Sequence, residues 1–284
     1  MGTHEPVAAA AATDTRAAWD RIAPAYDRTN TVTQMALAHE ALRRAGLQKG
    51  MRLLDVAAGS GALSVPAARL GAKVLAVDRS PAMLELLARR AKDEGLEIET
   101  RVMDGQALEL DDDHFDLVAS QFGVMLFADM PRGVAEMARV ASPGAKVLIV
   151  AYGDPQRIDF LHFFVRAVQS VRPSFDGPPE DEPPLEFQLA DPERLRSVLS
   201  AVGLVDVRVE SITETTAFDG SDALWDWIVS SNPIVECLLE ELRISADERN
   251  TVQRALAAAF RERAVEGVVR LSNPVNIGVG TRRR

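Results

Sequence analysis

The chain has 284 residues, of which 47% are hydrophobic and 26% charged, as in folded globular proteins rather than disordered or collagen-like chains. Its formal net charge of −10 disfavours a nucleic-acid partner, because a phosphate backbone repels it. The sequence has no apolar run of about 18 residues, so we expect no membrane-spanning helix. The single cysteine, Cys237, can form neither an internal disulfide nor, alone, a metal site, so we expect a cytoplasmic protein without a metal.

The first half of the chain predicts an α/β domain. Residues 1–13 are expected to be a frayed leader rather than a targeting signal, and residues 13–45 to be helical. Strands are then predicted at 51–56, 73–78, 97–103, 115–122 and 145–152, with helices at 62–70, 80–93 and 130–140. Strand–helix–strand alternation at this spacing predicts a parallel sheet with right-handed crossovers.

The second half has a different pattern. It begins with a predicted helix rich in phenylalanine, followed by a proline- and acid-rich loop at 173–184 that is a linker or a lid. Further helices are predicted at 191–201, 221–242 and 245–263, and strands at 205–211 and 268–279. We therefore expect an N-terminal helical cap (1–45), a core (46–153), an insertion or lid (154–190), and a C-terminal part of the core (191–284) with inserted helices (221–263).

The first candidate site is a carboxylate followed by a turn of small residues. Asp55 ends the first strand, and the turn runs over residues 57–61. Small residues let a ligand approach the backbone, and the helix that follows offers free N–H groups to an anion. A tight strand-to-helix turn with packing glycines has the same sequence, so this motif alone leaves both interpretations open.

Three more strands end in polar residues. Asp78 ends the second strand, where an acid can accept hydrogen bonds from both hydroxyls of a ribose. Asp104 follows the third strand and can accept a hydrogen bond from an adenine amino group, while Gln121 ends the fourth strand and can form a site wall. A helix cap, a turn acid and a strand exit are the ordinary alternatives. Four such features at successive strand ends favour a ligand site.

The glycine spacing separates two kinds of nucleotide cofactor. A nicotinamide cofactor usually requires Gly-x-Gly-x-x-Gly. If this motif began at Gly59, Ser64 would stand at the position of its third glycine, and if it began at Ala57, the first glycine would be missing. The motif therefore does not fit this turn. S-adenosylmethionine has no phosphate, and it needs carboxylates around its ribose and adenine together with a neutral turn.

The chain resembles the class I S-adenosylmethionine-dependent methyltransferases, and within them the small-molecule branch that includes the ubiquinone/menaquinone-biosynthesis C-methyltransferases. The segments that carry the resemblance are WDRIAPAYD (19–27), LDVAAGSG (54–61), VDRSPAML (77–84), VMDGQA (102–107), FDLVASQFG (115–123) and EMARV (136–140), with Pro143-Gly144 after them. The similarity covers residues 19–152 and fades afterwards. One departure is Ala57, which stands where the family often has its first glycine.

The resemblance implies a Rossmann-like fold, with a mostly parallel seven-stranded sheet, helices on both faces and a helical cap that binds the acceptor. It places the methionine end of the cofactor at Asp55 and the turn, and the ribose at Asp78. The adenine would lie near Arg79, Met83 and residues 104–106. Gln121 and Phe122 would line the sulfur side, and Tyr26 would close over the cofactor. The implied cofactor-binding residues are Tyr26, Asp55, Ala57, Ala58, Gly59, Gly61, Asp78, Arg79, Met83, Asp104, Gly105, Gln106, Gln121 and Phe122.

The expected reaction is methyl transfer to an oxygen, carbon or nitrogen of a small aromatic or apolar molecule. Enzymes speed such displacements mainly by alignment and desolvation, and a general base is optional. His162 is the candidate base, and a helix histidine packed on aromatic residues is the alternative. Trp225 and Trp227 form either an apolar lid or the core face of a helix.

The sequence leaves other functions and assemblies open. A cofactor-binding auxiliary protein without methyl transfer is the alternative, and an NAD(P)-dependent oxidoreductase is a weaker one. The expected partner is a small-molecule acceptor, with no nucleic acid and no membrane span, and the chain is expected to be a monomer or a homodimer.

Overall fold

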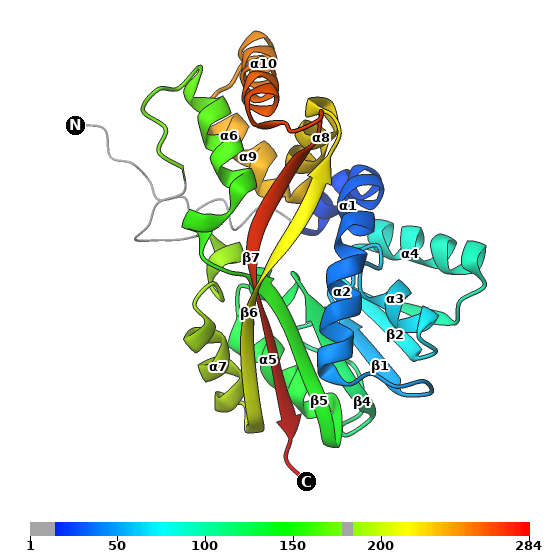
Figure 1. Cartoon of the computed structure of the whole chain (residues 1–284). Coiled ribbons are helices and arrows are strands. Elements are labelled where there is room, and N and C mark those ends of the chain that lie inside the picture. Colours follow the sequence, from blue (N-terminus) through cyan, green and yellow to red (C-terminus); the bar gives the residue numbers. More distant parts are fainter. Residues whose placement is uncertain (1–14, 178–183) are drawn as a thin grey trace.

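A computed structural model describes residues 15–177 and 184–284, which form one sheet with helices around it (Figure 1). The strands are β1 (Arg52–Val56), β2 (Lys73–Asp78), β3 (Ile98–Val102), β4 (Phe115–Gln121), β5 (Ala141–Tyr152), β6 (Leu204–Phe218) and β7 (Val269–Arg282). The α-helices are α1 (Thr15–Tyr26), α2 (Val32–Ala45), α3 (Ser64–Arg69), α4 (Pro81–Glu94), α5 (Met130–Val140), α6 (Asp159–Gln169), α7 (Pro192–Ala201), α8 (Ser221–Ser231), α9 (Pro233–Glu241) and α10 (Ala246–Arg263).

The sheet has seven strands in the order β3-β2-β1-β4-β5-β7-β6. β1 pairs in parallel with both β2 and β4, and β7 is antiparallel to β5 and β6. The expected mostly parallel seven-stranded sheet is confirmed. The strand order reverses at β1, because β2 and β3 lie on one side of it and β4 and β5 on the other. Open α/β sheets bind ligands at such a switch point.

The last two strands extend beyond the rest of the sheet. β5 pairs with β7 only over Val275–Thr281, whereas β6 follows β7 as far as the Phe218–Val269 pair. The predicted strand 205–211 is therefore too short. The alternation of inward and outward side chains continues beyond it, through the threonines of β6, to Phe218. The end of this ribbon supports α8, α9 and α10, which are inserted between the two strands (Figure 1).

The predicted helix 221–242 is two helices. Asn232 adopts an extended conformation (φ −157°) between α8 and α9, and Pro233 begins α9. Proline disfavours a helical conformation of the residue before it and has no N–H to continue the helix. The chain therefore bends at this point, and the start of α9 comes close to α1.

The described residues form two large hydrophobic cores and a smaller third one that includes Val65 and Leu87. One large core lies around the sheet and includes Leu42 of α2, Leu54 and Leu148. The other large core is in the cap, where Phe164 of α6 and Trp227 of α8 are buried. The expected division at residues 45, 153 and 190 stays a prediction, although α2 packs against β5 and belongs to the sheet layer.

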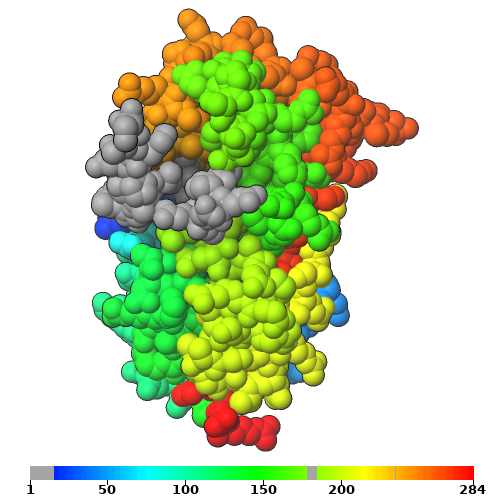
Figure 2. All heavy atoms as spheres, turned by 90° about the vertical axis from the view of Figure 1, so that its left-hand side faces the viewer, coloured from blue at the N-terminus to red at the C-terminus, as the bar shows by residue number. Residues whose placement is uncertain are grey.

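The cap forms one end of the molecule. Figure 2 shows the segments of α6 and α10 together at this end, and the two helices contact each other. Residues 1–13 of the expected leader, and residues 178–183 of the proline-rich loop, lie outside the described residues. Among the helices that the structure describes, none combines the length and hydrophobicity needed to cross a membrane.

Candidate functional site

The carboxyl ends of β1 and β2 are tied together by Asp78. Its Oδ2 accepts a hydrogen bond from the Gly59 N–H at 2.8 Å, and its Oδ1 accepts one from the Ser80 N–H at 2.9 Å. The Ser80 hydroxyl caps α4 by accepting from the Met83 N–H at 3.1 Å. Asp78 therefore fixes the glycine turn against the second strand while its carboxylate stays at the edge where ligands bind.

A second carboxylate lies beneath the turn. Asp55 is 1% exposed, and its Oδ2 accepts a hydrogen bond from the Ser64 hydroxyl at 2.6 Å. Burial raises the pKa of Asp55 to about 7, and the nearby charge of Asp78 contributes. Burial also raises the pKa of Asp78 above its usual value. Within residues 15–177 and 184–284 neither acid forms an ion pair with a basic side chain, so the two provide a site for a cation or for hydroxyl and amino donors.

The glycines of the site have two different roles. A Cβ atom on Gly59 (φ +54°) would meet only the Tyr26 ring, at 3.9 Å, so the turn is open here. A Cβ on Gly61 (φ +99°) would lie 2.3 Å from Leu87 Cδ1, and one on Gly105 would lie 2.6 Å from Phe127 Cζ. Gly61 and Gly105 are therefore packing glycines, and Gly59 is the point of close backbone approach.

Gln34 of α2 links Tyr26 to Gln121 by accepting a hydrogen bond from each of them. The Tyr26 hydroxyl donates to Gln34 Oε1 at 3.2 Å, and Gln121 Nε2 donates to the Gln34 carbonyl at 3.2 Å. Burial raises the pKa of Tyr26 to about 12. Gln121 Oε1 is buried without a hydrogen-bond partner, so it is an acceptor still available to a ligand.

A short π-helix, η2 (Asp27–Thr31), connects the cap to the glycine turn, and sequence reasoning missed it. The buried hydroxyls of Thr31 and Ser60 are 2.5 Å apart. Asn30 donates to the Trp227 carbonyl at 3.3 Å and to the Ser230 hydroxyl at 3.1 Å. Such π-turns often occur at functional sites. This one bonds α8 to the turn that contains Gly59.

The expected adenine-side residues follow the neighbouring strands β2 and β3, where the Met103 N–H donates to the Asp78 carbonyl at 2.9 Å. Asp104 Oδ1 accepts from the Gln106 N–H at 2.9 Å and from its Nε2 at 3.2 Å, which forms a closed turn. Met83 is buried in α4, and Arg79 is exposed. Ala58 is buried beneath the turn, and Ala57 has a positive φ of 57°.

A cavity of about 70 Å³ adjoins Tyr26 and Gln34 on the cap side. Phe122 (φ +56°) stacks on Tyr152 with ring centroids 4.5 Å apart, and both rings line the cavity. The full lining is Trp19, Tyr26, Gln34, Phe122, Met125, Leu126, Tyr152, Phe160, Leu161, Glu186, Phe187, Ser231, Asn232 and Val235. A larger hollow lined by Arg52 and Lys73 lies at the opposite edge, where the parallel strands begin. Ligands of parallel sheets bind at the carboxyl ends, so the smaller cavity is the functional one.

The structure separates His162 from this cavity. His162 is exposed on α6, whose other face buries Phe163 and Phe164, and it is absent from the lining. Trp225 and Trp227 are 5% and 4% exposed within the cap core, which supports the core interpretation over the lid. In the part of the chain that the structure describes, no cluster of three potential metal ligands occurs.

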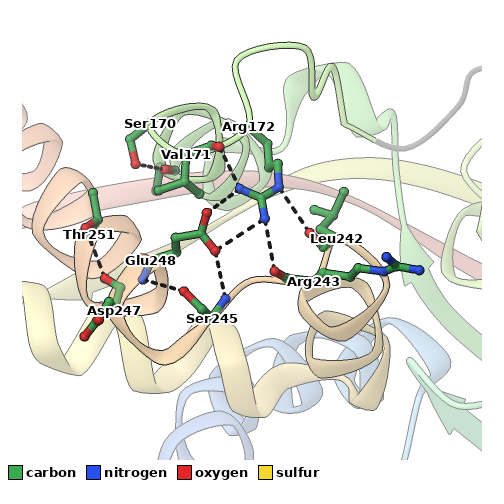
Figure 3. A network of polar contacts seen from close by, with 10 residues as sticks. Ser170, Val171, Arg172, Leu242, Arg243, Ser245, Asp247, Glu248 and Thr251 are labelled. Atoms are coloured by element: carbon green, nitrogen blue, oxygen red, sulfur yellow. Dashed lines mark hydrogen bonds and ion pairs between the residues drawn. The ribbon is translucent and has the colours of Figure 1, made fainter.

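An ion-pair network holds α6, which lines the cavity, to the rest of the cap (Figure 3). Arg172, just after α6, pairs with Glu248 of α10 at 2.6 Å and donates to the carbonyls of Leu242 and Arg243. The same Glu248 forms a capping box with Ser245. Because the network crosses three segments, it fixes the cap wall of the cavity.

Glu186, in the short helix η5 (Leu185–Phe187), is a lining residue that sequence reasoning missed. Burial raises its pKa to about 7, and its Oε2 is buried without a hydrogen-bond partner. No local motif marks it, because it is a single acid next to a proline- and acid-rich loop.

Comparisons with known proteins give a consistent result. Residues 54–149 match the model of a methyltransferase domain. The chain is 31% identical over 208 residues to a demethylmenaquinone methyltransferase of Thermus thermophilus, an alignment that covers 69% of this chain and 94% of the relative. A protein of the same name from Renibacterium salmoninarum is 31% identical over 207 residues, covering 69% and 86%.

Solved structures share the fold at low identity. The YcgJ protein of a Bacillus species is similar with a TM-score of 0.54 and 17% identity, covering 88% of this chain and 98% of that one. The [4+2]-cyclase SpnF is similar with a TM-score of 0.52 and 17% identity, covering 88% and 80%.

Proposed function

The chain belongs to the class I S-adenosylmethionine-dependent methyltransferases and methylates a small molecule, and we propose that its acceptor is aromatic or apolar and binds in the cavity below the cap. The observation that carries the proposal is the position of this aromatic cavity. It adjoins Tyr26, which lies over Gly59, and Gln121 follows at the end of β4. Donor and acceptor sites therefore share a wall.

The residues at the strand ends suit this cofactor. Asp78 would accept hydrogen bonds from the ribose hydroxyls, and Asp55 would balance the charge of the methionine ammonium group. The orphan Gln121 Oε1 is an acceptor for a donor of the ligand, and Gly59 leaves room for it beneath Tyr26. Asp104 and Gln106 remain the proposed contacts of the adenine edge.

When bound, S-adenosylmethionine would supply a methyl group whose carbon is attacked by a lone pair or carbon nucleophile of the acceptor, with S-adenosylhomocysteine as the leaving group. The contribution of the chain is alignment and exclusion of water. Phe122, Tyr152 and Phe160 form one stacked and one tilted ring pair, which would hold a flat molecule and keep water out. His162 is exposed, so the proposed geometry gives it no part in proton transfer.

Two neighbouring residues of α6 test the proposal as a matched pair. Leu161→Trp fills the cavity, whereas His162→Ala changes the exposed position beside it. Each protein is mixed with S-adenosylmethionine and a panel of aromatic acceptors, and S-adenosylhomocysteine formation is measured. We expect Leu161→Trp to lower methyl transfer at least about tenfold with unchanged S-adenosylhomocysteine binding, and His162→Ala to retain wild-type activity.

The opposite pattern contradicts the proposal: Leu161→Trp retains activity, which places the acceptor elsewhere, or His162→Ala loses it, which restores the histidine as base. Cofactor binding without methyl transfer to any acceptor supports the auxiliary protein.

Two expectations about the whole protein remain proposals. The single cysteine is consistent with the reducing cytoplasm, and we propose that the protein acts there. We also propose a monomer or a homodimer, which analytical ultracentrifugation distinguishes.

A further inference from the structure

Glu186 is held in a fixed position at the wall of the cavity. Directly after η5, Gln188 Nε2 donates to the carbonyls of Met125 and Phe127, at 2.5 and 3.0 Å. The neighbouring Phe187 ring packs near Tyr152, with centroids 6.2 Å apart. These contacts tie η5 to the segment that follows β4 and to the end of β5.

One oxygen of the Glu186 carboxylate lacks a hydrogen-bond partner. This oxygen, Oε2, is enclosed, and none of the described lining residues carries a positive charge. The other titratable groups of the lining are Tyr26 and Tyr152, and burial raises the pKa of both above the usual tyrosine value. An unsatisfied buried acceptor destabilises the folded state, so its retention at a ligand cavity indicates a donor on the ligand.

We propose that Glu186 selects the acceptor by accepting a hydrogen bond from its hydroxyl group, so that the acceptor is an aromatic molecule with a phenolic O–H. The aromatic lining suits the ring, and the orphan Oε2 suits one hydroxyl on it. An ammonium group could donate a hydrogen bond to Glu186, but it has no lone pair with which to accept a methyl group. A neutral O–H can donate the hydrogen bond and still keep a lone pair for the methyl group. The inference rests on the proposed function, because it assigns the acceptor to this cavity.

A second carboxylate serves as the control. Burial also raises the pKa of Glu214 on β6 to about 7, but Glu214 is not among the described lining residues. A role that depends only on burial would affect both residues equally, whereas acceptor recognition belongs to Glu186 alone.

The test uses phenol and its methyl ether, anisole, which differ by the proton that Glu186 would bind. Each is titrated by calorimetry into S-adenosylhomocysteine-saturated wild type, Glu186→Leu, Glu186→Gln and Glu214→Gln at about pH 8. Hydrogen bonds to charged groups predict that the wild type and Glu214→Gln bind phenol at least about tenfold more tightly than anisole. Glu186→Leu should bind both equally, and Glu186→Gln should restore part of the preference.

The pH dependence gives an independent readout. Because the pKa of Glu186 is about 7, its carboxyl becomes protonated below that pH and can donate to anisole, so the preference for phenol should shrink at about pH 5.5. The tyrosines facing it do not titrate in this range, since their pKa values are raised. Glu214, whose charge acts on Tyr152 and whose pKa is also about 7, is removed in the Glu214→Gln control, which should show the same pH dependence as the wild type. In Glu186→Gln the ratio should not change with pH.

The outcomes separate the two claims. A wild type that fails to bind S-adenosylhomocysteine contradicts the proposed function itself. A wild type that binds S-adenosylhomocysteine but neither aromatic, or both equally, overturns only the role of Glu186. A phenol preference that persists in Glu186→Leu also overturns it.

Discussion

Replacing Asp55 by asparagine removes a buried charge while keeping the shape of the side chain. The pKa of Asp55 is about 7 in the folded protein, against 3.8 for an ordinary aspartate. The folded state therefore holds a proton that the unfolded state has lost between these two pH values, so the stability contributed by this group falls as pH rises. Each pH unit in this interval costs about 1.4 kcal/mol.

Between about pH 5.5 and pH 8, ionisation of Asp55 should therefore lower the free energy of unfolding by about 2 kcal/mol. Asp55→Asn lacks this loss, and its amide oxygen can still accept from the Ser64 hydroxyl. Glu186 and Glu214 also have raised pKa values, but their contributions are the same in both proteins and cancel.

The assay is urea unfolding of the cofactor-free protein, wild type and Asp55→Asn, at both pH values. The difference between the two proteins should shift by about 2 kcal/mol in favour of the variant at the higher pH. An equal pH dependence in both proteins would refute the reasoning, because Asp55 would then not titrate in this interval.

Further predictions concern packing and the link between cap and turn. Relative to the wild type, Gly61→Ala should lower the urea midpoint of unfolding more than Gly46→Ala does. Both glycines have positive φ, but only at Gly61 would the Cβ meet another side chain, 2.3 Å away, so equal losses would contradict the packing role. Thr31→Val should cost about 1–3 kcal/mol of stability by leaving the buried Ser60 hydroxyl without its partner, and a double-mutant cycle with Ser60→Ala should recover a coupling energy of about 1 kcal/mol; additivity would show that the contact contributes nothing.

The sequence predicted the sheet well because local signals and burial agree there. Strand β2 and helix α5 have the predicted bounds, since an apolar run marks the strand, and an aspartate cap with a proline in the first turn marks the helix. The cap was predicted less well. The break at Asn232 and the length of β6 depend on packing between distant segments, which single-sequence periodicity does not contain.

The candidate site was predictable where the motif follows a strand. Asp55, Asp78 and Gln121 lie at the carboxyl ends of strands that the apolar pattern marks, so their common edge follows from the parallel sheet. Glu186 lies beside a loop, and its burial arises only when η5 packs against the segment after β4. Conversely, His162 was favoured because its segment follows the fifth strand, but Phe163 and Phe164 occupy the buried face of α6 and His162 is exposed.

The central claim is that the carboxyl edge of β1, β2 and β4 holds the cofactor. Calorimetric titration of S-adenosylhomocysteine into wild type, Asp78→Asn and Glu99→Gln tests it directly, because Glu99 is an exposed carboxylate within the edge strand β3. The asparagine can still accept one of the two N–H bonds that Asp78 accepts. The account predicts micromolar binding by the wild type and Glu99→Gln, and binding about tenfold to hundredfold weaker by Asp78→Asn. Equal affinity in all three proteins would contradict it.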